Sequence, residues 1–227
     1  MIHRLTDNNG PYDTILFDMD GTLIESGPGI MKAVRHMFGK MGITETDEAR
    51  IQAFIGPPII HHLKNVYGLS DADAHAAYGH YRAYYDANGI LECGLYPGIE
   101  GVLRTLKESG KTLYVATSKP EEQAHRMLKR TGVLDFFTRI FGAVHLEGVY
   151  TKDEVLVRAT TQLGGTPPHA VMIGDRSHDI LGGQHVGLDT IGVLYGYGSY
   201  DEFKEAGCDM IAERPSDLLS LLMEEDR

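Results

Sequence analysis

Residues 15–23 read ILFDMDGTL, and this stretch decides how the rest of the chain is interpreted. Its first three residues are apolar without alternation, a pattern typical of a strand that is covered on both faces. Two carboxylates, Asp18 and Asp20, follow this run directly. Carboxylates this close are costly unless a cation lies between them or one of them keeps its proton. The stretch therefore predicts a buried parallel strand with a charged site at its carboxyl end.

Three further apolar runs lie downstream, at residues 113–116, 171–174 and 190–194. The first two end in Thr117 and Asp175, as the opening run ends in Asp18. Because parallel sheets bind ligands at the carboxyl ends of their strands, we expect these three side chains to face one crevice.

Helical segments are predicted between the runs. They lie at residues 98–109, 120–130, 152–163 and 177–185. Strand, helix and strand in repetition are typical of a doubly wound, Rossmann-like α/β fold built on a parallel sheet.

Residues 27–94 interrupt this rhythm with helical patterns alone. An apolar stripe at helical spacing comprises Ile30, Val34, Met37 and Met41. Ser70 opens a capping-box pattern that predicts a helix reaching about residue 88. Glycine-proline turns at 27–29 and 96–98 flank the segment and could act as hinges.

We therefore predict two domains. An α/β core is formed by residues 1–24 and 95–227, and an all-helical domain at 25–94 is inserted after the first strand. In the other interpretation, these helices simply pack on one face of the sheet.

Composition limits the partners. The chain has 227 residues and a formal net charge of −11, which argues against nucleic acid polymers and anionic membranes. Its two cysteines form no CxxC pattern, and no long apolar run or leader-like segment is present. We expect a cytoplasmic protein without a membrane partner, in which a local cation or metal offsets the acidic field wherever a phosphate binds.

Four motifs, in order along the chain, resemble those of the haloacid dehalogenase superfamily of phosphatases. They are DMDGTL at 18–23, TSKP at 117–120, Lys152, and GDRSHD at 174–179. Residues 25–94 stand where that family carries its C1 helical cap. The core resembles the phosphoglycolate phosphatase branch, and the run IGVLYGYGS at 191–199 looks closest to relatives described as 5′-nucleotidases.

The resemblance implies a Mg²⁺-dependent phosphomonoesterase that acts on a small phosphorylated metabolite. Asp18 would attack phosphorus and become phosphorylated. Asp20 would protonate the leaving oxygen and then activate the water that cleaves the aspartyl-phosphate. Mg²⁺ would be held by the carboxylates of Asp18 and Asp175 and the backbone carbonyl of Asp20, with Asp179 in a supporting position.

The same resemblance implies the phosphate contacts. Thr117 and the backbone N–H of Ser118 would hold phosphate oxygens, with Gly21 and Thr22 at the first turn and Thr22 orienting Asp20. Lys152 would neutralise the phosphate charge. Relatives often carry Asn where this chain has Ser118.

Two neighbouring features have competing interpretations. Lys119 is expected to form a salt bridge outward rather than to serve as the catalytic lysine. The IGPP turn at 55–58 is a candidate for the cap loop that meets the substrate, and an ordinary interhelical turn is the other interpretation.

Rival functions stay open at this point. Asp20 favours phosphoryl transfer over dehalogenation, since a leaving halide needs no proton. A phosphomutase would use the same aspartyl-phosphate. From a different class, a non-catalytic phosphate acceptor or binding protein would need no complete site. Monomer and homodimer are both compatible with the sequence.

Overall fold

The computed structural model describes residues 2–4, 11–144, 149 and 151–223. The chain divides into two compact units. One combines Met1–Ile24 with Leu95–Arg227, and the other is Glu25–Gly94.

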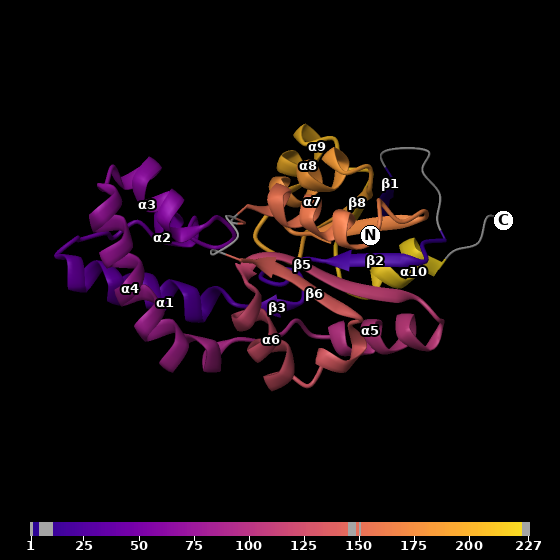
Figure 1. Cartoon of the computed structure of the whole chain (residues 1–227), viewed down its shortest axis with the longest axis horizontal. Coiled ribbons are helices and arrows are strands. Elements are labelled where there is room, and N and C mark those ends of the chain that lie inside the picture. The colour runs from indigo at the N-terminus through magenta and orange to yellow at the C-terminus, as the bar shows by residue number, and fades with distance from the viewer. Residues whose placement is uncertain (1, 5–10, 145–148, 150, 224–227) are drawn as a thin grey trace. The chain divides into compact units, whose positions relative to one another are not determined.

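A seven-stranded sheet forms the centre of the larger unit (Figure 1). Its order is β1-β9-β8-β7-β2-β5-β6, and neighbouring strands are parallel except for the β1–β9 pair. The strands are β1 (Ile2–Arg4), β9 (Met210–Ala212), β8 (Asp189–Val193), β7 (Ala170–Gly174), β2 (Thr14–Phe17), β5 (Thr112–Pro120) and β6 (Arg139–Ala143). The predicted α/β fold is confirmed, with all four predicted runs in the sheet.

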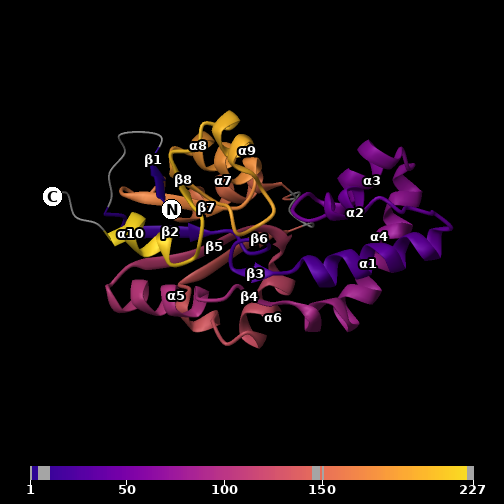
Figure 2. The same cartoon turned by 180° about the vertical axis from the view of Figure 1, so that it is seen from behind.

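Helices cover both faces of this sheet. Figures 1 and 2 show α7, α8 and α9 on one face and α5, α6 and α10 on the other. Their bounds are α5 (Ile99–Glu108), α6 (Glu121–Arg130), α7 (Lys152–Gln162), α8 (Ser177–His185), α9 (Tyr200–Glu205) and α10 (Asp217–Met223), with a short 3₁₀ turn η2 (Leu134–Phe136). The four helices predicted between the strands lie within one residue of their expected bounds.

Strand β2 lies in the middle of the sheet, between the two strands that carry Thr117 and precede Asp175. The strand pairs with β5 on one side and β7 on the other, with Phe17 opposite both Val115 and Ile173. Its apolar residues are fully buried. Because the chain winds away from β2 in both directions, the carboxyl ends of β2, β5 and β7 border the switch point where such sheets bind ligands.

The sequence did not indicate β1, β6 or β9. Strand β6 opens on the exposed Arg139 and contains Gly142, which weakens its apolar pattern. Strand β9 has only three residues, all buried. Short strands of this kind are defined by their sheet partners more than by their own sequence.

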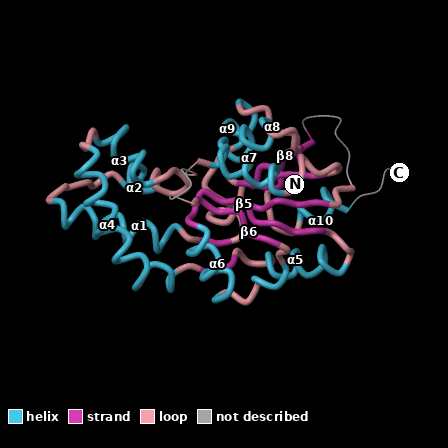
Figure 3. Tube along the Cα trace, in the orientation of Figure 1, coloured by secondary structure: helices cyan, strands magenta, loops and turns pink. Residues whose placement is uncertain are grey.

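The unit Glu25–Gly94 is built of helices, as Figure 3 shows by colour. They are α1 (Gly27–Met41), α2 (Glu48–Gln52), α3 (Ile59–Tyr67), α4 (Asp71–Ala87) and a 3₁₀ turn η1 (Gly89–Glu92). Three of the four residues in the predicted apolar stripe are buried in α1, and Met41 is half-buried. Ser70 caps α4 by accepting the N–H of Asp73 at 3.1 Å, as its pattern predicts.

The predicted turn at 27–29 is wrong. Gly27, Pro28 and Gly29 form the first turn of α1, where proline is well tolerated. A Cβ on Gly29 would overlap the carbonyl of Gly89, so glycine is needed there for close packing rather than for bending. The connections to this unit contain β3 (Ile24–Glu25) and β4 (Gly94–Leu95), which pair with each other.

Both cysteines are buried as free thiols. Burial raises the pKa of Cys208 to about 11, which keeps it protonated and unreactive at neutral pH. Among the described residues, no helix is long and apolar enough to cross a bilayer.

Candidate active site

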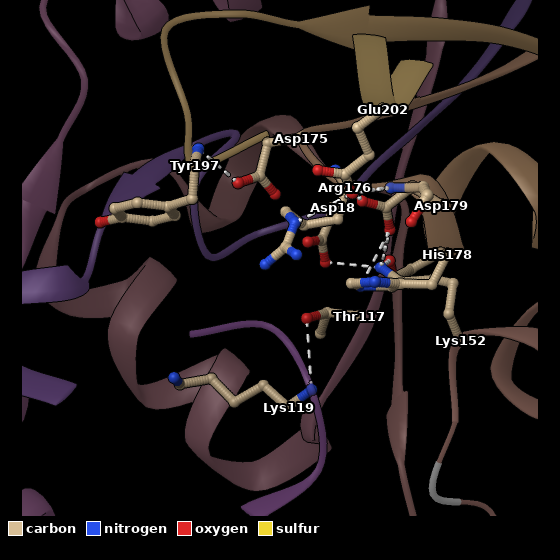
Figure 4. Close-up of polar contacts among 12 residues, drawn as sticks. Asp18, Thr117, Lys119, Lys152, Asp175, Arg176, His178, Asp179, Tyr197 and Glu202 are labelled. Carbon is tan, nitrogen blue, oxygen red and sulfur yellow. Dashed lines mark hydrogen bonds and ion pairs between the residues drawn. The ribbon is translucent and has the colours of Figure 1, made fainter. Parts of the chain in front are cut away.

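Three strand ends and one helix start bring the polar groups together (Figure 4). Asp18 follows β2, Thr117 lies near the end of β5, and Asp175 follows β7. Lys152 is the first residue of α7. Each of these residues is at most 4% exposed, so the site is a buried polar cluster.

Lys152 is the cation at the centre of the cluster. Its Nζ donates to Asp18 Oδ1 at 2.6 Å and to the carbonyl of Ala116 at 2.7 Å. The same ammonium lies 2.8 Å from Asp179 Oδ1. Two hydrogen bonds and a close ion pair around one ammonium offset the cost of burying it.

A cluster of three carboxylates surrounds this lysine. One oxygen each from Asp18, Asp175 and Asp179 lies within 4.8 Å of the other two. Asp179 reaches the cluster from α8 because Gly174 leaves room, since a Cβ there would overlap the Asp179 side chain. The remaining oxygen of Asp179 accepts the backbone N–H of Arg176 at 3.0 Å.

Burial and charge interactions shift the pKa values of the three carboxyls and of Lys152 in different directions. Burial raises the pKa of Asp18 to about 6, against the attraction of Lys152. Burial, together with Asp179 and Asp18, raises the pKa of Asp175 well above its usual range. Burial would raise the pKa of Asp179 as well, yet Lys152 and His178 lower it. The Lys152 pKa is raised because Asp179 and Asp18 outweigh its burial.

The cluster fits a divalent cation. Three buried carboxylates face one ammonium, so full ionisation leaves two negative charges uncompensated. Burial and then the neighbouring carboxylates raise the pKa values of two of these carboxyls, and a dication would favour their charged forms. An all-oxygen donor set is the one that Mg²⁺ prefers.

Asp20 lies apart from this cluster, against a different lysine. Lys119 Nζ donates to Asp20 Oδ1 at 3.1 Å and to Oδ2 at 2.9 Å. The lysine side chain is 6% exposed, so the expectation that Lys119 forms a salt bridge outward is wrong. The Asp20 carboxylate is therefore not among the clustered oxygens.

Thr117 presents a hydroxyl whose hydrogen is available. The backbone N–H of Lys119 donates to Thr117 Oγ1 at 3.3 Å, so this hydroxyl acts as an acceptor toward the protein. Its own hydrogen can point elsewhere, for example at a phosphate oxygen. Ser118 follows on the same strand end and is half-buried.

Gly21 and Thr22 have different structural roles at the first turn after β2. Gly21 has a left-handed backbone with φ of 86°, and a Cβ there would overlap the Asp175 carboxylate. Thr22 is fully buried, and its hydroxyl oxygen has no hydrogen-bond partner within the described residues. The expected orientation of Asp20 by Thr22 is thus not made by a hydrogen bond.

The segment 195–198 was missed as part of the site. The backbone N–H of Tyr197 donates to Asp175 Oδ2 at 2.9 Å. The flanking Gly196 and Gly198 lie so close to Asp175 that a Cβ on either would overlap it. The alternating glycines of GYG are the sequence signal that could have indicated this close approach.

Glu202 is a second missed residue. One of its oxygens accepts the backbone N–H of Ser177 at 2.6 Å and the Arg176 Nε–H at 3.1 Å. It thereby fixes the turn that presents Asp175 and Asp179. Arg176 binds Glu202, and burial lowers the pKa of His178.

Several known proteins are similar to this chain in sequence and fold. The chain is 40% identical over 194 residues to a 5′-nucleotidase of Pseudomonas aeruginosa, covering 85% of this chain and 87% of that one. It is 38% identical over 187 residues to the tyrosine-protein kinase PtkA of Mycobacterium tuberculosis, covering 82% of this chain and 64% of that protein. A crystal structure of a predicted phosphatase from Clostridium acetobutylicum superposes with a TM-score of 0.90 at 36% identity, covering 95% of this chain and all of that one.

A family model also matches most of this chain. The model for haloacid dehalogenase-like hydrolases matches residues 15–193. This range includes Asp18, Thr117, Lys152 and the segment 175–179. The chain therefore belongs to the haloacid dehalogenase-like hydrolase family and is a phosphatase-type enzyme of that family.

Proposed function

We propose that the protein is a Mg²⁺-dependent phosphomonoesterase that forms an aspartyl-phosphate on Asp18. One observation carries the proposal. A buried carboxylate at the end of the central strand is held by a buried lysine, with two further carboxylates beside it. This arrangement offers a nucleophile, a phosphate-neutralising cation and a metal site within a few ångströms.

Asp18 is the proposed nucleophile. Lys152 holds its Oδ1 at 2.6 Å, which leaves Oδ2 to attack phosphorus. As the new O–P bond forms, the bond from phosphorus to the leaving oxygen breaks. Asp20 gives its proton to that oxygen, then takes a proton from the water that attacks the aspartyl-phosphate.

Thr117 and Lys152 stabilise the transferred phosphoryl group. The Thr117 hydroxyl donates to one phosphate oxygen, and the Lys152 ammonium stays close enough to balance the charge of another. Donors that are already fixed at a buried site stabilise developing charge more strongly than water does.

The proposed Mg²⁺ ligands are the carboxylates of Asp18 and Asp175 and the backbone carbonyl of Asp20. Asp179 supports the site through Lys152 and the N–H of Arg176. When bound, the ion would balance the charge of the phosphoryl oxygens and of the clustered carboxylates.

Nucleoside 5′-monophosphates are the proposed substrate class, and 2-phosphoglycolate is the alternative. The relative named 5′-nucleotidase supports the first, as does the 191–199 run that contributes Tyr197 to the site. The helical unit Glu25–Gly94 would serve as the cap, with its 55–58 loop meeting the substrate. We propose a cytoplasmic location, with the substrate as the main partner.

The test is phosphate release by the purified protein with Mg²⁺. The panel holds nucleoside 5′-monophosphates, 2-phosphoglycolate, pyrophosphate and hexose phosphates. We expect strong preference for one class and loss of activity with EDTA. A folded, metal-loaded protein that releases phosphate from none of them would overturn simple hydrolysis and favour a phosphomutase or a binding protein.

A further inference from the structure

A second lysine–aspartate pair lies at the same end of the sheet as the Asp18–Lys152 pair. Lys119 is the next-to-last residue of β5, and Asp20 lies just beyond the carboxyl end of the neighbouring strand β2. Their side chains are 6% and 12% exposed, and the ammonium contacts both carboxylate oxygens, at 3.1 and 2.9 Å. The described fold thus gives each carboxylate of the DMD motif its own lysine.

Burial makes this pair unlike an ordinary surface ion pair. Taking an ammonium out of water is costly unless its partner is well placed, and a buried pair is weak support for stability. A lysine retained at such a position is better explained by what it does to its partner. Contact with both oxygens restrains the carboxylate, because rotation about the Cβ–Cγ bond would break one of the two hydrogen bonds.

The backbone of Lys119 is restrained as well. Its N–H donates to the Thr117 hydroxyl oxygen, which we propose as a phosphate ligand. Figure 4 shows the Lys119 side chain leaving β5 in a direction away from Lys152. The last part of β5 therefore links the proposed phosphate ligand to the Asp20 carboxylate.

We propose that Lys119 is a positioning residue for Asp20. It holds the carboxylate where the group can pass a proton to the leaving oxygen and later take one from water. This inference rests on the proposed function, in which Asp20 is the general acid and base. Lys119 acts through Asp20 and makes no bond to the reacting atoms.

A rival role makes Lys119 a ligand for a second negative charge on the substrate. The two roles predict that loss of the lysine lowers kcat/KM for different substrates. A positioning residue matters most when the leaving oxygen is strongly basic and needs a proton. A charge-binding residue matters most when the leaving group is anionic.

The experiment compares Lys119→Met, Lys119→Arg and Lys111→Met with the wild type. Lys111 is a matched control, because it pairs with Asp13 at 3.4 Å across the opposite ends of the same two strands. The substrates are p-nitrophenyl phosphate, a nucleoside 5′-monophosphate and 2-phosphoglycolate. The measured quantity is kcat/KM, which covers the steps up to release of the leaving group.

We expect Lys119→Met to lower kcat/KM about 10- to 100-fold for both alkyl phosphates and much less for p-nitrophenyl phosphate. Lys119→Arg should recover part of the loss, and Lys111→Met should match the wild type. A loss confined to 2-phosphoglycolate would overturn positioning in favour of charge binding. An equal loss on all three substrates would also overturn it.

A double-mutant cycle gives an independent readout. With a nucleoside 5′-monophosphate, on which Lys119→Met alone should be slow, adding Lys119→Met to Asp20→Asn should cause no further loss, since the group it positions is already disabled. Additive losses would contradict the proposal. Failure of the proposed function is distinguishable, because the wild type itself would then release no phosphate with Mg²⁺.

Discussion

At the scale of single residues, the main feature of the site is an excess of buried negative charge. Asp18, Asp175 and Asp179 share a buried volume with one lysine. The pKa of Asp18 is raised from 3.8 to about 6, so the folded protein binds this proton more tightly than the unfolded chain does. Without metal, ionised Asp18 therefore destabilises the fold. Its cost is absent below about pH 4, grows between about pH 4 and 6, and is complete above that range.

Asp18→Asn should stabilise the metal-free protein at neutral pH. We expect a gain in the free energy of unfolding of about 1–3 kcal/mol at pH 7.5, shrinking to nearly none at about pH 4. Lys152 keeps Asp179 and the Ala116 carbonyl as partners in this variant. Urea unfolding in EDTA at the two pH values measures the effect. Asp13→Asn, a change at an exposed carboxylate just before β2, is the control. A gain of equal size at both pH values would contradict the assignment.

At the scale of elements, helix starts and close-packed turns aim the side chains. Helix α7 begins with a capping box, in which Thr151 Oγ1 accepts the Glu154 N–H at 3.3 Å and Glu154 Oε2 accepts the Thr151 N–H at 2.9 Å. Lys152 follows the cap directly, so the cap fixes where the ammonium enters the site. Segment 195–198 does the same for Asp175 through the Tyr197 N–H.

Thr151→Ala should weaken both stability and catalysis. The lost cap costs about 1 kcal/mol, and a less fixed Lys152 should lower kcat/KM by up to about tenfold. Chemical denaturation and turnover of p-nitrophenyl phosphate measure the two effects. Ser70→Ala removes the corresponding cap from α4 and should affect stability without that loss of turnover. If both variants lose turnover equally, the cap does not act through Lys152.

Gly196→Ala should weaken the metal site. The added Cβ would overlap Asp175 and the Gly21 carbonyl, so the segment must move away and take the Tyr197 N–H with it. We expect Mg²⁺ affinity to fall about 10- to 100-fold by calorimetry, without any need for turnover. Gly101→Ala in α5, where a Cβ meets open space, is the control. Unchanged affinity in Gly196→Ala would show that segment 195–198 does not support the metal ligand.

At the scale of the whole molecule, the chemistry and the helical unit are separate in the chain. Every proposed catalytic and metal residue lies in the unit of Met1–Ile24 and Leu95–Arg227. The two connections pair through β3 and β4, so the chain leaves and returns at neighbouring points. A short linker could therefore join these two points in place of the helical unit. The larger unit should still fold, because units with their own cores generally fold alone.

Replacing residues 26–93 by a short glycine-serine linker should leave a folded core. We expect it to hydrolyse p-nitrophenyl phosphate with Mg²⁺ and to lose the preference among natural substrates that the full chain shows. Circular dichroism and the phosphate-release panel measure the two properties. A folded, metal-binding core that keeps the full preference would place substrate choice in the core instead.

Local sequence determined much of this protein. Unalternated apolar runs marked β2, β5, β7 and β8, because strands buried on both faces need apolar residues at every position. Polar residues directly after those runs marked Asp18, Thr117 and Asp175, since parallel strands place their ends at one edge. A capping pattern marked the start of α4 at Ser70. These signals lie within a few residues of each other along the chain.

Only the tertiary structure decided which charges pair. Lys119 meets Asp20 across 99 residues of sequence, and Lys152 joins Asp18 to Asp179. The approach of segment 195–198 to Asp175 depends in the same way on how strand ends pack. The physical reason is that ion pairs and close backbone contacts depend on distances of a few ångströms between segments far apart in the chain, and these distances are fixed only once the sheet has assembled.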